Sequence, residues 1–185
     1  MKLKRMVRYR TDISGKWADL SAALMGASFF LQACYYFAYR GLVSCSAGEI
    51  LLGLILPLAG AAAWIVLLRL IPQCNVKVYA FCGAALCLIL ALQGFYTDNL
   101  IVAVLAFVWY LIMAVTVIFV CFGYLPYRIL LSVVTLLPAV VRVLIVLGVY
   151  IFPGKYWHGL SDYAVILMLL SLTCLSGMLQ SPKKG

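Results

Sequence analysis

The sequence has few charged residues. Asp, Glu, Lys and Arg make up 10% of the 185 residues, whereas hydrophobic residues make up 67%, and the mean hydropathy is +1.14. A soluble domain usually has about a quarter of its residues charged. This chain therefore lacks the polar side chains needed to cover a surface in water. The shortage excludes a soluble globular domain and predicts an integral membrane protein whose surroundings are the lipid bilayer.

The motifs of common enzyme classes are also missing. The single histidine excludes an H-E-x-x-H site, the seven cysteines form no C-x-x-C pair, and neither a G-x-S-x-G elbow nor a P-loop occurs. We therefore predict no metal site, no cofactor and no catalytic residue. One alternative is a membrane-embedded enzyme that uses His158 with Asp162. In the other interpretation Asp162 caps a helix and His158 lies at the membrane interface.

Six apolar runs are present, each long enough to cross a bilayer as a helix of about 20 residues. We place them at residues 18–40, 48–70, 76–95, 99–122, 127–151 and 161–180. They lack the strict alternation of a transmembrane β-strand. The sequence therefore predicts an all-α, polytopic integral membrane protein. A bundle of six transmembrane helices over 18–180 lies between a basic tail at 1–17 and a short tail at 181–185.

Lys and Arg are distributed unevenly between the two ends of these runs. With the N-terminus inside, the outer loops hold two basic residues, Arg40 and Lys155. The inner segments hold eleven: Lys2, Lys4, Arg5, Arg8, Arg10, Lys16, Arg69, Lys77, Arg128, Lys183 and Lys184. This bias predicts that both termini are cytoplasmic and that the chain is a multi-pass protein of the cell membrane. The formal net charge of +9 is thus a topology signal, and we expect no nucleic-acid partner.

The stretch "LQAC", ending at Cys34, looks like a lipoprotein processing site behind a basic N-terminus. The residues after Cys34 are "YYFAYR", which are apolar and aromatic instead of the polar start of a secreted domain. Cleavage would also leave five spans. An uncleaved first helix is therefore the favoured interpretation.

Two helices carry stripes of small residues, which allow another helix backbone to approach closely in a bilayer. We predict that these stripes pack against a partner: Ala18, Ala22 and Gly26 on the first helix, and Gly83, Cys87 and Gly94 on the third. A possible membrane-protein partner follows from this pattern.

The fifth predicted helix places Arg142 inside the bilayer, where a charge is costly unless it faces protein or water. Other polar and aromatic side chains gather toward the outer ends of the helices. We predict an outward-facing cavity lined by Arg142, Gln32, Tyr35, Tyr39, Asp98, Trp109 and Asp162. The planar guanidinium of Arg142 suits a carboxylate or phosphate, so the ligand would be an anionic small molecule. The alternative is an ordinary aromatic belt with polar residues at helix ends.

In architecture the chain resembles the substrate-binding subunits of energy-coupling-factor vitamin transporters. Those subunits are small, have about six spans and bind their ligand from outside. The resemblance implies that a small-residue motif on the first helix, here Ala18, Ala22 and Gly26, docks a transmembrane partner. We therefore expect a ligand-capturing or transport component. A non-catalytic structural subunit of a membrane complex, with Arg142 paired internally, remains the alternative.

Overall fold

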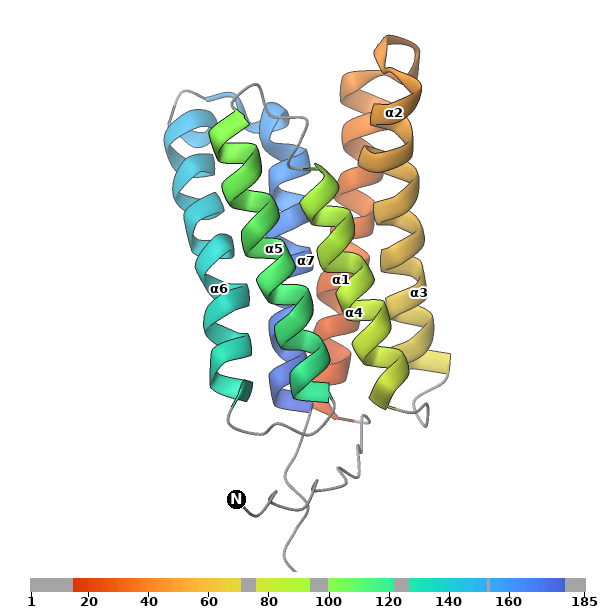
Figure 1. Ribbon diagram of the computed structural model, residues 1–185. Coiled ribbons are helices and arrows are strands. Elements are labelled where there is room, and N and C mark those ends of the chain that lie inside the picture. The colour runs from red at the N-terminus through yellow and green to blue at the C-terminus, as the bar shows by residue number, and fades with distance from the viewer. Residues whose placement is uncertain (1–14, 71–75, 94–99, 122–126, 153, 179–185) are drawn as a thin grey trace, which may run out of the picture.

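The computed structural model of the chain describes residues 15–70, 76–93, 100–121, 127–152 and 154–178 (Figure 1). These residues form helices joined by turns, and no strand occurs among them. The prediction of an all-α chain is therefore confirmed.

Six longer helices lie within the described residues. They are α1 (Lys16–Cys34), α3 (Leu56–Leu70), α4 (Val76–Gln93), α5 (Leu100–Cys121), α6 (Tyr127–Val146) and α7 (Leu160–Met178). Shorter segments extend or connect them: the π-helical η1 (Tyr35–Arg40), η3 (Ile50–Ile55) and η5 (Leu147–Ile151), the 3₁₀ turns η2 (Leu42–Ser44) and η6 (Tyr156–Gly159), and α2 (Ala47–Glu49). The first helix runs through Cys34 without a break, because η1 continues α1.

Five helical stretches are long and apolar enough to cross a membrane. They cover Lys16–Arg40, Ala47–Leu70, Leu100–Cys121, Ile129–Ile151 and Tyr156–Met178. A sixth apolar helix, Lys77–Gln93, is shorter. The described residues thus have the composition and the helix lengths of a membrane protein, as the sequence predicts.

Neighbouring helices close into a ring. Contacts join α1 to α3, α3 to α4, α4 to α5, α5 to α6, α6 to α7, and α7 back to α1. The last helix is the most enclosed, since 61% of its most apolar window is buried, against 28–33% for the other four long stretches. Figure 1 shows α7 and α1 side by side over most of their length, behind α5 and α4.

Buried serines hold α1 against α7. Ser21 Oγ donates to the carbonyl of Ser171 at 3.0 Å, and Ser171 Oγ donates to the carbonyl of Ser21 at 2.8 Å. Ser28 Oγ donates to the carbonyl of Ala164 at 2.7 Å. The indole Nε1 of Trp64, on α3, donates to Ser21 Oγ at 3.0 Å. Lipid offers no hydrogen-bond partner, so this polar face of α1 must turn inward.

The small-residue stripe of α4 lies in the core of the chain. Ala80 and Cys87 are fully buried, and a Cβ atom on Gly83 would lie 3.0 Å from Val117 Cγ1 and 3.4 Å from Trp64 Cζ3. Gly83 therefore sits where side chains of α3 and α5 both lie close to α4, and its missing side chain leaves room for the Trp64 ring beside the α4 backbone.

Candidate functional site

A polar cavity of about 370 Å³ opens at the end of the bundle where α1 and α3 are joined through η1 and η3. Polar side chains from several helices line it, together with Tyr36, Gly53 and Val165: Gln32, Tyr35, Arg40, Glu49, Gln93, Arg142 and Ser161. This concentration of polar groups in an otherwise apolar bundle is unusual, since lipid-facing positions cannot satisfy them. The cavity has the volume of a small-molecule site.

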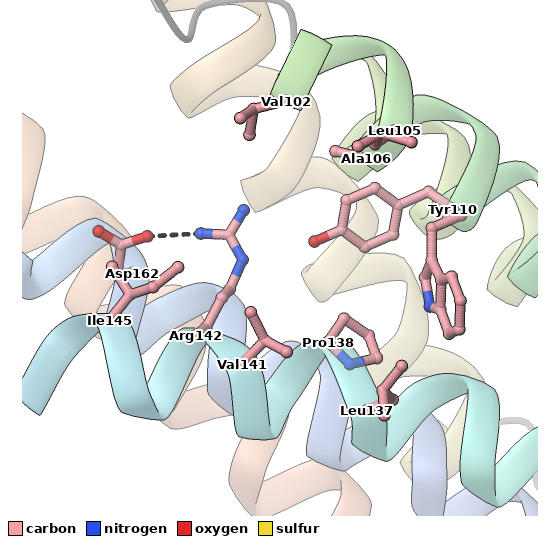
Figure 2. Close-up of a pocket in the computed structure, with 11 residues that line it drawn as sticks. Val102, Leu105, Ala106, Tyr110, Leu137, Pro138, Val141, Arg142, Ile145 and Asp162 are labelled. Atoms are coloured by element: carbon pink, nitrogen blue, oxygen red, sulfur yellow. Dashed lines mark hydrogen bonds and ion pairs between the residues drawn. The ribbon is translucent and has the colours of Figure 1, made fainter. Parts of the chain in front are cut away.

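Arg142 forms part of the wall of this cavity and is paired with a carboxylate. Its Nη1 donates to Oδ1 of Asp162, in the first turn of α7. The two side chains keep 28% and 27% of their surface exposed. The pair is therefore neither sealed in the core nor on the open surface. Figure 2 shows the guanidinium between Asp162 on one side and the Tyr110 hydroxyl on the other.

Two glutamine side chains in the wall of the polar cavity donate hydrogen bonds to backbone carbonyls that lack a helical donor because of Pro57. Pro57 has no N–H, so carbonyls four and five residues earlier lack their helical donor. Gln32 Nε2 donates to the carbonyl of Gly53, and Gln93 Nε2 donates to the carbonyl of Leu52 at 3.1 Å. Ser161 Oγ lies 3.4 Å from Gln32 Oε1. These bonds hold both amide groups in fixed positions on the cavity wall.

Pro138, inside α6, also leaves a backbone carbonyl without its helical donor, and a side chain from another helix bonds to it. Pro138 in α6 frees the carbonyl of Val134. Trp109 Nε1, on α5, donates to that carbonyl at 2.9 Å. The indole ring is thereby fixed between α5 and α6.

Next to this ring lies a second, apolar cavity of about 470 Å³ (Figure 2). Apart from Arg142 and Asp162, its lining is almost entirely hydrophobic and comes from α5 and α6: Val102, Leu105, Ala106, Trp109, Tyr110, Leu137, Pro138, Val141 and Ile145. Leu105 and Val141 remain 65% and 48% exposed, so the cavity opens sideways, out of the bundle between the two helices. Arg142 lines both cavities and separates them.

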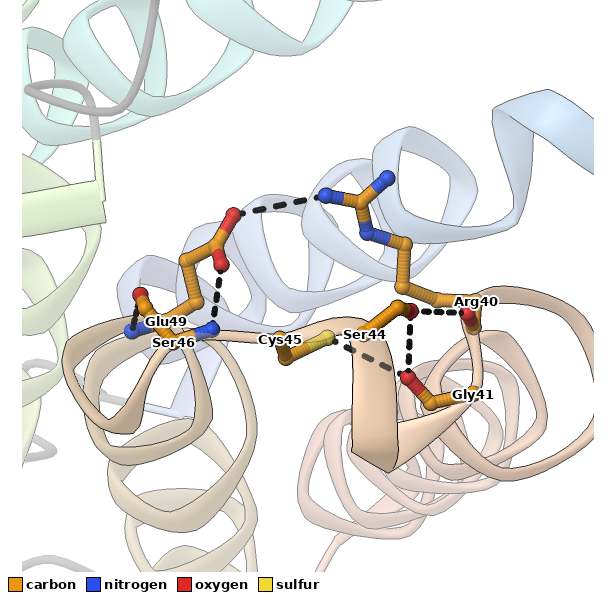
Figure 3. Close-up of polar contacts among 6 residues, drawn as sticks. All are labelled: Arg40, Gly41, Ser44, Cys45, Ser46 and Glu49. Carbon is orange, nitrogen blue, oxygen red and sulfur yellow. Dashed lines mark hydrogen bonds and ion pairs between the residues drawn. The ribbon is translucent and has the colours of Figure 1, made fainter.

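A compact turn forms the rim of the polar cavity (Figure 3). Gly41 adopts a positive φ of 76°, and Ser44 Oγ donates to the carbonyls of Arg40 and Gly41 at 2.8 and 2.9 Å. Ser46 and Glu49 form a reciprocal capping box at the start of α2, with bonds of 2.8 and 3.2 Å. Arg40 Nη2 lies 3.5 Å from Glu49 Oε1, which adds an ion pair across the turn.

The structure brings together part of the predicted ligand-binding set. Arg142, Gln32 and Tyr35 all line the polar cavity. Asp162 reaches Arg142 from α7, whereas Trp109 lines the apolar cavity. Tyr39 is 40% exposed at the rim, with its ring 5.8 Å from that of Tyr35. Asp98 lies outside the described residues. The ligand role of these residues stays a prediction.

His158 and Asp162, the candidate catalytic pair, contact different residues. The Asp162 carboxylate binds Arg142, and the His158 ring packs edge-on against the Tyr39 ring at 5.0 Å.

The residues predicted to pack against a partner take different positions. Ala18 and Ala22 are each 6% exposed, and Gly83 and Cys87 lie in the core, so these side chains pack within the chain itself. Gly26 differs, because a Cβ atom there would meet no atom within 4 Å. Gly94 lies outside the described residues. Among the described residues of this set, Gly26 therefore has open space beside it in which another protein could pack.

Sequence reasoning missed Arg40 and Ser161 as cavity residues, and it placed Tyr36, Glu49 and Gln93 at the outer ends of the helices without their contacts. Tyr36 follows Gln32 by four residues, which places both on one face of the first helix. Its hydroxyl fills the space beside Gly53, where a Cβ atom would lie only 1.8 Å from it. The sequence signal for this contact is the four-residue spacing between Gly53 and Pro57. Pro57 leaves the carbonyl of Gly53 without a helical donor, and Gly53 has no side chain to block the approach of another group.

We compared the chain with protein families, curated proteins and solved structures, and found no family model, no curated protein and no solved structure that matches it. Any functional conclusion must therefore come from the two cavities and from Arg142.

Proposed function

We propose that the chain is a ligand-capturing or transport component of the cell membrane. In this proposal it has six transmembrane helices, both termini lie in the cytoplasm, and the polar cavity opens to the outside. The shorter helix α4, with 18 residues, still falls within the range of about 17–25 residues that span a bilayer. The uneven distribution of Lys and Arg supports the orientation.

The observation that carries the proposal is the position of Arg142 in the wall of the polar cavity. Its guanidinium has five N–H donors, and its partners in the bundle are Asp162, which accepts from Nη1, and the Tyr110 hydroxyl (Figure 2). The remaining donors, with the hydroxyls of Tyr35 and Ser161 in the same lining, suit the oxygens of a carboxylate or phosphate. Arg40 and Arg142 balance Glu49 and Asp162 in formal charge, so an anionic group is held by directed hydrogen bonds more than by a surplus of positive charge.

A second candidate function is a structural subunit of a membrane complex. The observation in its favour is that Arg142 already has an internal carboxylate. The other ion pairs of the described residues also join separate helical segments, Arg40 with Glu49 and Arg69 with Asp19. In this alternative the pairs serve only to fasten the bundle.

Replacing Arg142 by lysine separates the two functions. Arg142→Lys keeps the charge for Asp162 but loses the planar fork that binds two oxygens at once. The protein purified gently in a mild detergent should carry an anionic adduct in native mass spectrometry, and Arg142→Lys should lose most of it. The matched control is Arg69→Lys, which changes the Asp19 pair and touches neither cavity.

Equal adduct occupancy in the wild type, Arg142→Lys and Arg69→Lys would contradict ligand capture at Arg142. A wild type that carries no anionic adduct but copurifies with a membrane protein would support the structural alternative instead.

A further inference from the structure

The apolar cavity adds information about the ligand. It lies directly beside Arg142, and the two cavities share that residue in their linings. A ligand at Arg142 therefore has a polar environment on one side and a hydrocarbon-like environment on the other.

We propose that the ligand is an amphiphile with one oxyanionic head group and a hydrocarbon chain. The head, a carboxylate or phosphate, binds Arg142 at the polar cavity, and the chain lies in the apolar cavity between α5 and α6. This inference rests on the proposed function and names the class of its ligand.

The shape of the apolar cavity supports a chain over a compact group. Its lining runs along α5 from Val102 to Tyr110 and along α6 from Leu137 to Ile145. Eight residues of helix extend about 12 Å, so the lining extends along the two helices. The charged pair Arg142–Asp162 lies toward one end of this length, as Figure 2 shows, and Leu137 and Pro138 lie toward the other.

The route of entry also favours a lipid-like ligand. The apolar cavity opens between α5 and α6 through side chains that are about half exposed. In a transmembrane bundle such side chains face the bilayer. A chain that is already dissolved in the bilayer enters sideways without crossing water. Lipid tails are as apolar as leucine, so burying the chain adds little hydrophobic free energy. Selectivity then comes from packing against the fixed Trp109 ring and from the bonds to Arg142.

Trp109 provides a direct test, because bromine atoms quench indole fluorescence at contact. The protein is reconstituted in phosphatidylcholine vesicles and titrated with a stearate brominated at mid-chain. We expect a saturable component of quenching that is lost in Trp109→Phe. Unlabelled palmitate should reverse this component, whereas acetate should not.

Two variants test separately how the hydrocarbon chain and the head group contribute to binding. Val141→Phe fills the apolar cavity, and Val140→Phe is the matched control, because Val140 is similarly exposed (54% against 48%) but does not line the cavity. Val141→Phe should raise the half-saturating probe concentration about tenfold relative to Val140→Phe. Arg142→Lys should raise it by a similar factor, since a weakened charge-assisted bond costs at least about a factor of ten in affinity.

The two proposals fail in different ways. If acetate displaces the probe as well as palmitate does, or if Val141→Phe binds like Val140→Phe while Arg142→Lys still weakens binding, the amphiphile is overturned and an anionic ligand remains. If Arg142→Lys binds the probe as the wild type does, or if no component of quenching saturates, both proposals are overturned.

Discussion

At the scale of single residues, the central feature is an arginine that is held inside an apolar bundle by one carboxylate. The sequence indicates that Arg142 needs a partner, because a charge in a bilayer is costly. Of the five acidic residues in the chain, the sequence places three at the outer ends of helices within reach of Arg142, namely Glu49, Asp98 and Asp162. It does not identify Asp162 among them, because the choice depends on how α6 and α7 are rotated against each other.

The Arg142–Asp162 pair predicts a non-additive pattern of stability. Arg142→Leu leaves Asp162 without its partner and should lower the free energy of unfolding by about 2 kcal/mol, less than the ~3–5 kcal/mol of a fully buried pair. The double variant Arg142→Leu with Asp162→Leu should recover most of that loss, because no unpaired charge remains. Thermal unfolding in detergent measures both.

The exposed pair Arg69–Asp19 is the control for this experiment, with side chains 54% and 65% exposed. Arg69→Leu should cost less than about 1 kcal/mol. A double variant no more stable than Arg142→Leu alone would show that Asp162 does not depend on Arg142.

At the scale of helices, the sequence predicts faces better than contacts. The first helix has a polar stripe that is recognisable because lipid cannot satisfy Gln32: Ser21, Ser28, Gln32, Tyr35 and Tyr39. The structure buries the first three, whereas Tyr35 is partly exposed and Tyr39 is 40% exposed. The acceptor of Gln32 was not predictable, because it depends on the carbonyl of Gly53 that Pro57 frees on another helix. The apolar cavity was not predictable from the sequence either, because it results from the spacing between α5 and α6 and not from any residue type.

The two glycines in the small-residue stripes should respond differently to a large side chain. Gly83→Leu places atoms where Val117 and Trp64 already lie, and we expect it to lower the free energy of unfolding by about 1–3 kcal/mol or more. In Gly26→Leu the added Cβ atom meets no neighbouring atom within 4 Å. It should leave the stability unchanged or slightly raised, because Leu favours the helix over Gly.

Thermal unfolding in detergent distinguishes the two glycine variants, and pull-down from membranes adds a second measurement. Loss of a copurifying protein in Gly26→Leu, with stability intact, would identify Gly26 as a partner contact. Equal stability of Gly83→Leu and the wild type would contradict the close approach of α3, α4 and α5.

At the scale of the whole molecule, composition was sufficient for the fold class, because 67% hydrophobic residues in long runs predict apolar helices, and the described residues form helices long and apolar enough to cross a membrane. The run lengths correctly located the described helices to within a few residues. The π-helical turns were not foreseen: Ile50–Ile55 is π-helical immediately before Pro57, where two carbonyls are bonded by Gln32 and Gln93 instead of by helical N–H groups. Such a deviation depends on donors from distant helices, which local sequence does not contain.

Orientation decides which compartment the polar cavity faces, and two exposed positions at opposite ends of the bundle test it. Val43 is fully exposed in η2, within the turn that forms the rim of the polar cavity. Leu70, at the end of α3 beside the Arg69–Asp19 pair, is 76% exposed.

In a background in which Cys45 is replaced by Ala, a membrane-impermeant maleimide should label Val43→Cys in intact cells. Leu70→Cys should react only after the membrane is permeabilised. The opposite pattern would place the rim in the cytoplasm, so the ligand would be captured from inside the cell and the positive charges would lie on the wrong side for the usual topology rule.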